Sequence, residues 1–355
     1  MRRLFGWALA PMMLAAAGTA SAASLDIRNT ALRVVVIPEA RSDVSVTILK
    51  TNSRLPLKLT TGLSGQTIVD GGQWFAPFGQ AIWCEGDGVH VWGVGHIANA
   101  DLPQILVRMP LDARVSAGGG IFGAISRAER LDLAVSGCGD WTVGNVRDRL
   151  AVGSSGSANV RTGTADQMAL QASGSGDIVT RAALGGLDAA VSGSGEITVE
   201  QASGPVRIRG SGSGDLVVNG GQASRLDVDV SGSGDVQFKG AAQDLSAGLS
   251  GNGEIATGAV TRSLGVDISG SGDMTVAAAS GTVRARISGS GALKIAGGHA
   301  STVDARISGS GDVDFDGQAD TVNASSSGSG NLRVARVTGA VVSSATGSGR
   351  VIVNR

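Results

Sequence analysis

A short glycine-rich phrase returns twelve times after residue 130, and it limits the possible folds more than any other feature of the sequence. The phrase usually reads Ser-Gly-Ser-Gly followed by Asp or Glu, and successive copies begin 18 to 20 residues apart. A self-similar period of this length is typical of a solenoid, in which each repeat is one unit stacked on the next. The first residues of the copies are Ser136, Ser155, Ser173, Ser192, Ser211, Ser231, Ser250, Ser269, Ser288, Ser308, Ser327 and Thr346.

The residues on both sides of each phrase predict strands. Around the copy at Ser192, Leu187 and Val191 lie before the phrase and Ile197 and Val199 after it, with small or polar residues between them. This period of two belongs to a strand with one buried face, and no window shows apolar residues at helical spacing. One repeat cannot bury its own apolar face, whereas stacked repeats can. The sequence therefore predicts an all-β fold, a parallel β-helix over residues 131–355 with coils of about 19 residues.

The glycines of the phrase share strand parity with the apolar residues. Gly193 and Gly195 alternate in step with Val191 and Ile197, so they belong to the inward set, and Glu196 belongs to the outward set. This parity favours an inward bend at which no side chain fits. The alternative is a tight turn with the glycines at positive φ.

The N-terminal third lacks the phrase. Residues 1–22 have a charged start, an apolar stretch and small residues before a cleavage point, which predicts a secretory signal peptide. Residues 23–130 alternate like strands, for example at Leu32, Val34 and Val36, and we expect them to form an N-terminal cap or irregular first coils. No later segment is long and apolar enough to span a bilayer.

The two cysteines, Cys84 and Cys138, are 54 residues apart. An oxidising compartment would favour a disulfide between them, and two buried free thiols are the alternative. Two thiols alone are too few for a structural zinc site.

Three features together resemble a known family. They are the exported N-terminus, the segment 32–50 reading LRVVVIPEARSDVSVTILK with a later strand ending at Pro110, and the returning SGSGD phrase. The chain resembles the auto-transporter adhesin head GIN domain family. The resemblance implies a right-handed β-helix, an exported location and a role in adhesion or at a surface. The family has no established catalytic residues, so none is carried over.

An outward acidic column follows the phrase. In a stack these carboxylates would lie about 5 Å apart. Each could cap its local backbone at the bend, or neighbours could bridge a cation such as calcium. Asn159 and Asn331 at the same position favour capping, so the column is only a weak metal candidate. Its members in six successive coils are Asp177, Glu196, Asp215, Asp235, Glu254 and Asp273.

Nothing in the sequence predicts catalysis or a cofactor. Adjacent carboxylates match the spacing of a retaining glycosidase, but any pair in the column does so, and uniform coils provide no cleft. His90, His96 and His299 suggest no Ser-His-Asp set. His90 and His96 share strand parity, so a metal is conceivable there, although a plain strand with exposed or packed histidines is favoured. The phrase lacks the GK[ST] ending of a phosphate loop.

We therefore expect a non-enzymatic exported β-helix, an adhesin-like surface or periplasmic binding or scaffold protein whose surface ligand is a glycan or a protein. The alternatives are a polysaccharide-binding or polysaccharide-cleaving β-helix and, because serines form outward columns, an ice- or mineral-binding face. A net charge of −1 gives no electrostatic reason to expect nucleic acid. Weak end-to-end self-association at the final coil is also expected, because an open coil presents unpaired backbone groups. The competing expectation is that the arginines there keep the rod monomeric.

Overall fold

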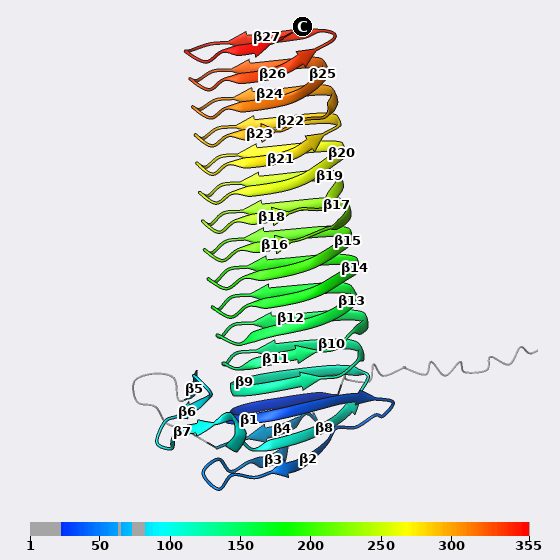
Figure 1. Cartoon of the computed structure of the whole chain (residues 1–355), viewed down its shortest axis with the longest axis vertical. Coiled ribbons are helices and arrows are strands. Elements are labelled where there is room, and N and C mark those ends of the chain that lie inside the picture. Colours follow the sequence, from blue (N-terminus) through cyan, green and yellow to red (C-terminus); the bar gives the residue numbers. More distant parts are fainter. Residues whose placement is uncertain (1–22, 63–64, 73–81, 355) are drawn as a thin grey trace, which may run out of the picture.

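The computed structural model describes residues 23–62, 65–72 and 82–354. Strands stacked along one axis form a tall rod, with an irregular group of strands at the N-terminal end (Figure 1). The predicted all-β parallel solenoid is confirmed. The predicted signal peptide lies outside the described residues.

The chain divides into N-terminal strands and the strands of the stacked coils. The N-terminal elements are β1 (Ser24–Glu39), β2 (Ser45–Lys50), β3 (Lys58–Thr61), β4 (Thr67–Asp70), β5 (Ile82–Glu85), β6 (Gly88–Val91), β7 (Gly95–Ala98), the 3-10 helix η1 (Asn99–Asp101) and β8 (Gln104–Pro110). The coils contain β9 (Asp112–Ile125), β10 (Ala128–Val135), β11 (Asp140–Val143), β12 (Val146–Ser154), β13 (Asn159–Ala172), β14 (Ile178–Val191), β15 (Ile197–Gly210), β16 (Leu216–Val218), β17 (Gly221–Val230), β18 (Val236–Phe238), β19 (Ala241–Leu249), β20 (Ile255–Ile268), β21 (Met274–Ala279), β22 (Gly281–Ile287), β23 (Leu293–Ile295), β24 (His299–Ile307), β25 (Val313–Ser326), β26 (Leu332–Val337), β27 (Val341–Ala345) and β28 (Val351–Val353).

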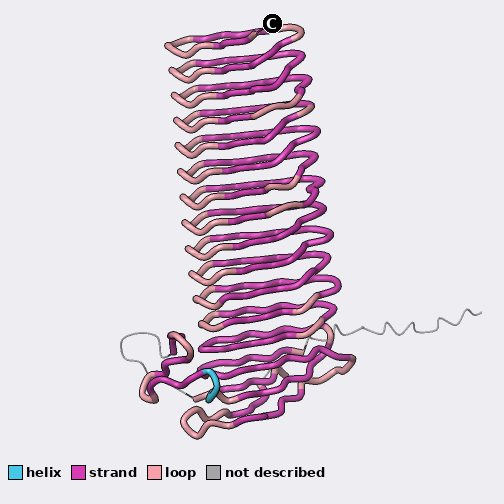
Figure 2. The backbone as a smooth tube through the Cα atoms, viewed as in Figure 1, coloured by secondary structure: helices cyan, strands magenta, loops and turns pink. Residues whose placement is uncertain are grey.

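Each coil contributes one strand segment before a phrase and one after it, and the phrases line up along one edge of the rod (Figure 2). Strands pair in parallel with their equivalents one coil away, as Ile178 does with Ile197 and Leu187 with Val206. The inward residues form one continuous aliphatic core, in which Trp141 is fully buried. Alternation of side chains across a strand therefore places one set in the core and the other on the rod's outer faces.

In the regular phrases the second glycine is buried, as its parity predicts, and the first is half-buried. Within the described phrases, positive φ occurs only at Gly139 and Gly347, in the first and last copies, so the tight-turn alternative is wrong for the regular coils. A methyl group on Gly193 would collide with the carbonyl oxygen of Gly174, which is the equivalent residue of the coil before it. At this first glycine position of the phrase, successive backbones approach each other too closely for any side chain, whereas the second position holds Ala158 in one coil.

A glycine next to the phrase differs in this respect and provides a test. Gly210 occupies an inward position, and an added methyl would lie 3.9 Å from methyl groups of Val230 and Val236, at ordinary contact distance. We expect Gly210→Ala to raise the free energy of unfolding by about 1 kcal/mol, by filling space and restricting the unfolded chain. Gly212→Ala, two residues away, is expected to lower it by about 1–3 kcal/mol, because its methyl would strike the Gly193 carbonyl. Denaturant unfolding of both variants measures the difference, and equal effects would contradict this account of the bend.

The N-terminal strand lies inside the stack and not at its end. β1 pairs in parallel with β9 on one side and with β4 and β8 on the other. Along the chain, the cap strands β2 to β8 lie between β1 and β9, although β1 and β9 are neighbours in space. β2 and β3 pair antiparallel with β8 and β4, which closes this end of the core. Parallel pairing with the rod thus begins well before residue 131.

A small three-stranded sheet, β5–β7, is attached to the rod by the predicted disulfide. Cys84 in β5 is bonded to Cys138, with a Cα–Cα distance of 5.8 Å. Cys138 replaces the second serine of the first phrase, so the bond joins the sheet to the phrase edge. The pairing predicted from the sequence is confirmed.

Candidate functional site

The acidic column forms a ladder of hydrogen bonds between coils. In each rung, a carboxylate oxygen accepts the backbone N–H of the equivalent residue one coil later. This differs from the local cap expected from the sequence, because the donor lies 19 or 20 residues further along the chain. The recorded rungs join Asp177 to Glu196 at 2.9 Å, Asp215 to Asp235, Asp235 to Glu254 and Asp273 to Ala292 at 2.8 Å each, and Asp312 to Asn331 at 2.7 Å.

The asparagines in this column act in the same way. The side-chain oxygens of Asn159 and Asn331 accept the N–H groups of Asp177 and Arg350 at 3.2 Å. Across the described ranges, no group of three or more His, Cys, Asp or Glu side chains has the geometry to hold a metal ion. A cation bridging the column from Asp177 to Asp273 stays a prediction.

The three histidines lie apart from this column. His90 and His96 were expected on one plain strand, which is wrong. Gly93 and Gly95 adopt positive φ, so the chain turns and the two histidines face each other across the antiparallel strands β6 and β7. The His90 ring stacks on Trp83 with centroids 4.3 Å apart.

His299 lies far from that pair, on β24. Its Nε2 is 2.8 Å from Asp320 Oδ1, and this hydrogen bond, together with one from Thr338, lowers the pKa of Asp320. No triad of serine, histidine and aspartate emerges from these placements in the described chain.

A shallow groove runs along the rod beside the phrase edge, and we call it the phrase groove. It consists of three hollows in a row, with volumes of about 230, 500 and 490 Å³. The first two share Gln171, and the last two share Asp267 and Ser269. The hollows extend from the coil of Ser136 to that of Ser327, a distance of about 48 Å at the usual 4.8 Å between parallel strands.

One side of the phrase groove is a column of hydroxyl groups, the first serines of the phrases. Hydroxyls of Ser136, Ser155, Ser173 and Ser250 donate to carbonyl oxygens of the coil before, at 3.4–3.5 Å. A hydroxyl that donates in this way keeps lone pairs with which to accept hydrogen bonds. The column therefore offers one acceptor per coil along the groove.

The other side contains both small and charged residues. Ala190 and Gly248 are small, so the groove is deeper where they lie. The equivalent positions of other coils hold Arg209, Arg286 and Arg306. Each of these arginines is paired with an aspartate: Arg209 with Asp188 at 3.1 Å, Arg286 with Asp267 at 3.6 Å and Arg306 with Asp304 at 3.3 Å. Asp229 also lines the groove, and it has no ion pair among the described residues. This side therefore has no excess of positive charge and does not favour an anionic ligand.

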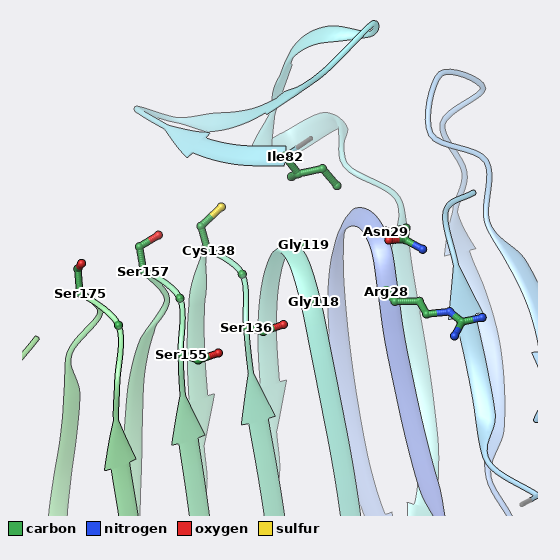
Figure 3. A pocket seen from close by; sticks show the side chains of 13 residues that line it. Arg28, Asn29, Ile82, Gly118, Gly119, Ser136, Cys138, Ser155, Ser157 and Ser175 are labelled. Carbon is green, nitrogen blue, oxygen red and sulfur yellow. The ribbon is translucent and has the colours of Figure 1, made fainter. Parts of the chain in front are cut away.

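At the cap the phrase groove opens into a larger cavity of about 570 Å³, which we call the cap cavity (Figure 3). The two spaces share Ser136 and Ser155. Ile82 of β5 overhangs the cavity, and Ser157 and Ser175 point toward that strand. The lining residues are Arg28, Asn29, Ile82, Gly118, Gly119, Ser136, Gly137, Cys138, Ser155, Gly156, Ser157, Gly174 and Ser175.

Among the described residues, Arg28 is the one arginine that lines the cap cavity, and its charge is already paired. Its Nε donates to Asp70 Oδ2 at 2.9 Å, and Asp26 lies 3.9 Å from its Nη1. Partial burial opposes ionisation of Asp70, but hydrogen bonds from the Gly72 N–H and from Arg28 lower its pKa overall. Asp70 is therefore ionised at neutral pH, and the cavity wall has no uncompensated positive charge.

Comparisons with known proteins bear on this part of the rod. Residues 179–298 match the model of a family described as "Putative auto-transporter adhesin, head GIN domain". The resemblance noted from the sequence is confirmed over this segment, which contains the central coils of the phrase groove.

Two further comparisons add little. A crystal structure described as a "Putative lipid binding protein" from Parabacteroides distasonis is similar with a TM-score of 0.31 and 14% identity, covering 94% of each chain. The search of curated proteins found no match.

In the portion that the structure describes, no helix is long and apolar enough to cross a membrane.

Proposed function

We propose that this protein is an exported, non-enzymatic, adhesin-like binding protein that holds an extended ligand along the phrase groove. The observation that carries the proposal is the continuity of the groove, whose hollows share residues from Ser136 to Ser327. The family match to an adhesin head domain supports a binding role. The disulfide supports an oxidising, extracytoplasmic location.

Among extended ligands, a polysaccharide is favoured over a charged polymer. The groove combines a hydroxyl column with a side whose arginines are each paired with an aspartate, and sugars are recognised largely through hydrogen bonds to their own hydroxyls. Binding is favoured over cleavage, because aspartates of the acidic column such as Asp177 and Asp215 are engaged as acceptors of backbone N–H groups. Such groups stabilise the coils and are poorly placed to exchange protons with a substrate.

Filling the groove tests the proposal. Ala190→Arg with Gly248→Arg places long side chains on the groove floor, at positions where the other coils already carry Arg209 and Arg286, so the fold is expected to tolerate them. Against a panel of immobilised neutral polysaccharides and matrix proteins, we expect the affinity of the double variant to fall at least about tenfold, equivalent to about 1.4 kcal/mol.

The matched control is Ala256→Arg. Ala256 is outward on the strand segment that follows a phrase, where Lys294 and Arg333 stand in other coils, and it does not line the groove. The control should bind like the wild type. Equal binding by all three proteins, or binding of none of the panel by the wild type, would refute the proposal.

A further inference from the structure

We infer that the cap cavity is a binding site for the terminal unit of the ligand chain, and that this unit is a neutral sugar. The inference rests on the proposed function of the phrase groove. Because the cavity shares Ser136 and Ser155 with the groove, a chain lying in the groove reaches it without a break. There Ile82 of β5 lies over the phrase edge (Figure 3).

The wall over the cavity is held in place by contacts on two sides. The Cys84–Cys138 disulfide ties β5 to the first phrase. A side chain on Gly120 would collide with Val89 and press on Ile82, so the absence of one lets the small sheet lie directly on the coil. A wall fixed in this way gives the cavity a defined shape before any ligand arrives, which reduces the entropic cost of binding.

The chemistry of the lining selects a neutral, hydroxyl-rich ligand. Ser157 and Ser175 supply hydroxyls that can donate and accept hydrogen bonds, and Ser136 and Ser155, which donate to backbone carbonyls, supply acceptors. Ile82 supplies an apolar surface on the opposite side. A sugar ring has the matching character, with polar hydroxyls at its edge and C–H groups on its faces.

The pairing of the nearest charge argues against an anionic ligand. Arg28 has two carboxylate neighbours, Asp26 and Asp70, so the cluster has an excess of negative charge. A carboxylate, sulfate or phosphate group would meet net repulsion there. The volume of about 570 Å³ is within the range of small-ligand pockets and exceeds any one hollow of the groove.

Short sugars test the cavity separately from the groove. The probes are glucose, galactose, mannose and N-acetylglucosamine, with glucuronic acid as the anionic counterpart, and binding to the full mature chain is followed by saturation-transfer NMR. We expect at least one neutral sugar to bind and glucuronic acid to bind more weakly. Ser157→Gln with Ser175→Gln fills the cavity, and we expect it to reduce binding of that sugar at least tenfold.

The matched control is Ser271→Gln with Ser290→Gln, at the same phrase position in distant coils. This position holds an amide side chain naturally at Asn252, so both variants should fold, and the control should bind like the wild type.

Loss of sugar binding in both double variants, unchanged binding in the cavity variant, or no binding of the neutral sugars by the wild type would overturn the inference. If the short sugars fail while the groove variant loses polysaccharide binding, the proposed function stands and only the terminal site is wrong.

Discussion

Replacing Trp141 by alanine is expected to lower the free energy of unfolding by about 3–5 kcal/mol, the usual cost of removing a large buried aromatic side chain. The Trp141 indole is fully buried, and it packs in the space that Gly123 leaves in the adjacent strand, since a methyl on Gly123 would overlap the ring. Denaturant unfolding followed by circular dichroism measures the loss.

Trp141→Phe is the control for this prediction. The indole Nε1 is buried, and it has no hydrogen-bond partner among the described residues. Phenylalanine removes that unsatisfied donor, a gain of about 1–3 kcal/mol that offsets part of the lost packing. The phenylalanine variant should therefore be clearly more stable than the alanine variant. Similar stability of the two, or an alanine variant within about 1 kcal/mol of wild type, would contradict this account of the first coil.

Removing the disulfide is expected to have the second large effect. Cys84→Ala with Cys138→Ser opens a loop of 54 residues, and the chain-entropy estimate for a loop of this length is roughly 4 kcal/mol. Cys138→Ser also restores the Ser-Gly-Ser-Gly-Asp phrase of the other coils, so the coil itself should be undisturbed. The loss should therefore be confined to the cap.

Limited proteolysis and thermal unfolding measure this effect. Cleavage within residues 82–101 should become faster in the double variant, while fragments of the coils from β13 onward stay protected. Wild type treated with a reductant is the control and should behave like the double variant. Unchanged cleavage and unchanged thermal unfolding would show that the small sheet is held by packing alone.

The coils could be predicted from the sequence because one physical rule repeats in each of them. Apolar residues such as Val206 and Leu226 must face inward, their spacing of two allows only strands, and a period near 19 allows only stacked coils. The same parity placed Gly193 and Gly195 on the inner side. The prediction did not identify the obstacle that makes glycine necessary there, because that obstacle is a carbonyl group of another coil.

The cap could not be predicted in the same way. β1 pairs with β9, so Leu25 lies beside Val115, and no local pattern specifies a partner 90 residues away. The turn between His90 and His96 depends on the positive φ of Gly93 and Gly95, whereas alternation alone suggested one strand.

The candidate site could not be predicted from the sequence either. Serines such as Ser192 were recognised as outward columns, but the groove beside them depends on which side chains the stacked coils bring together, such as Gly248 and Arg209. The cap cavity needs β5 to overhang the phrase edge, which the paired cysteines indicated only in part. The hydrogen bonds of the acidic column were expected within one bend, and they connect neighbouring coils instead.

The ladder also means that the length of this protein can change by whole coils during evolution. Each rung joins equivalent positions of neighbouring coils, and each first phrase glycine lies against the phrase glycine of the coil before, so a segment of one full period can be duplicated or lost while the columns stay aligned. An insertion or deletion of a few residues would instead break the alignment of all the columns at once. Unequal recombination between near-identical phrases would therefore adjust the reach of this molecule in steps of about 4.8 Å. Its length can evolve while its cross-section stays the same.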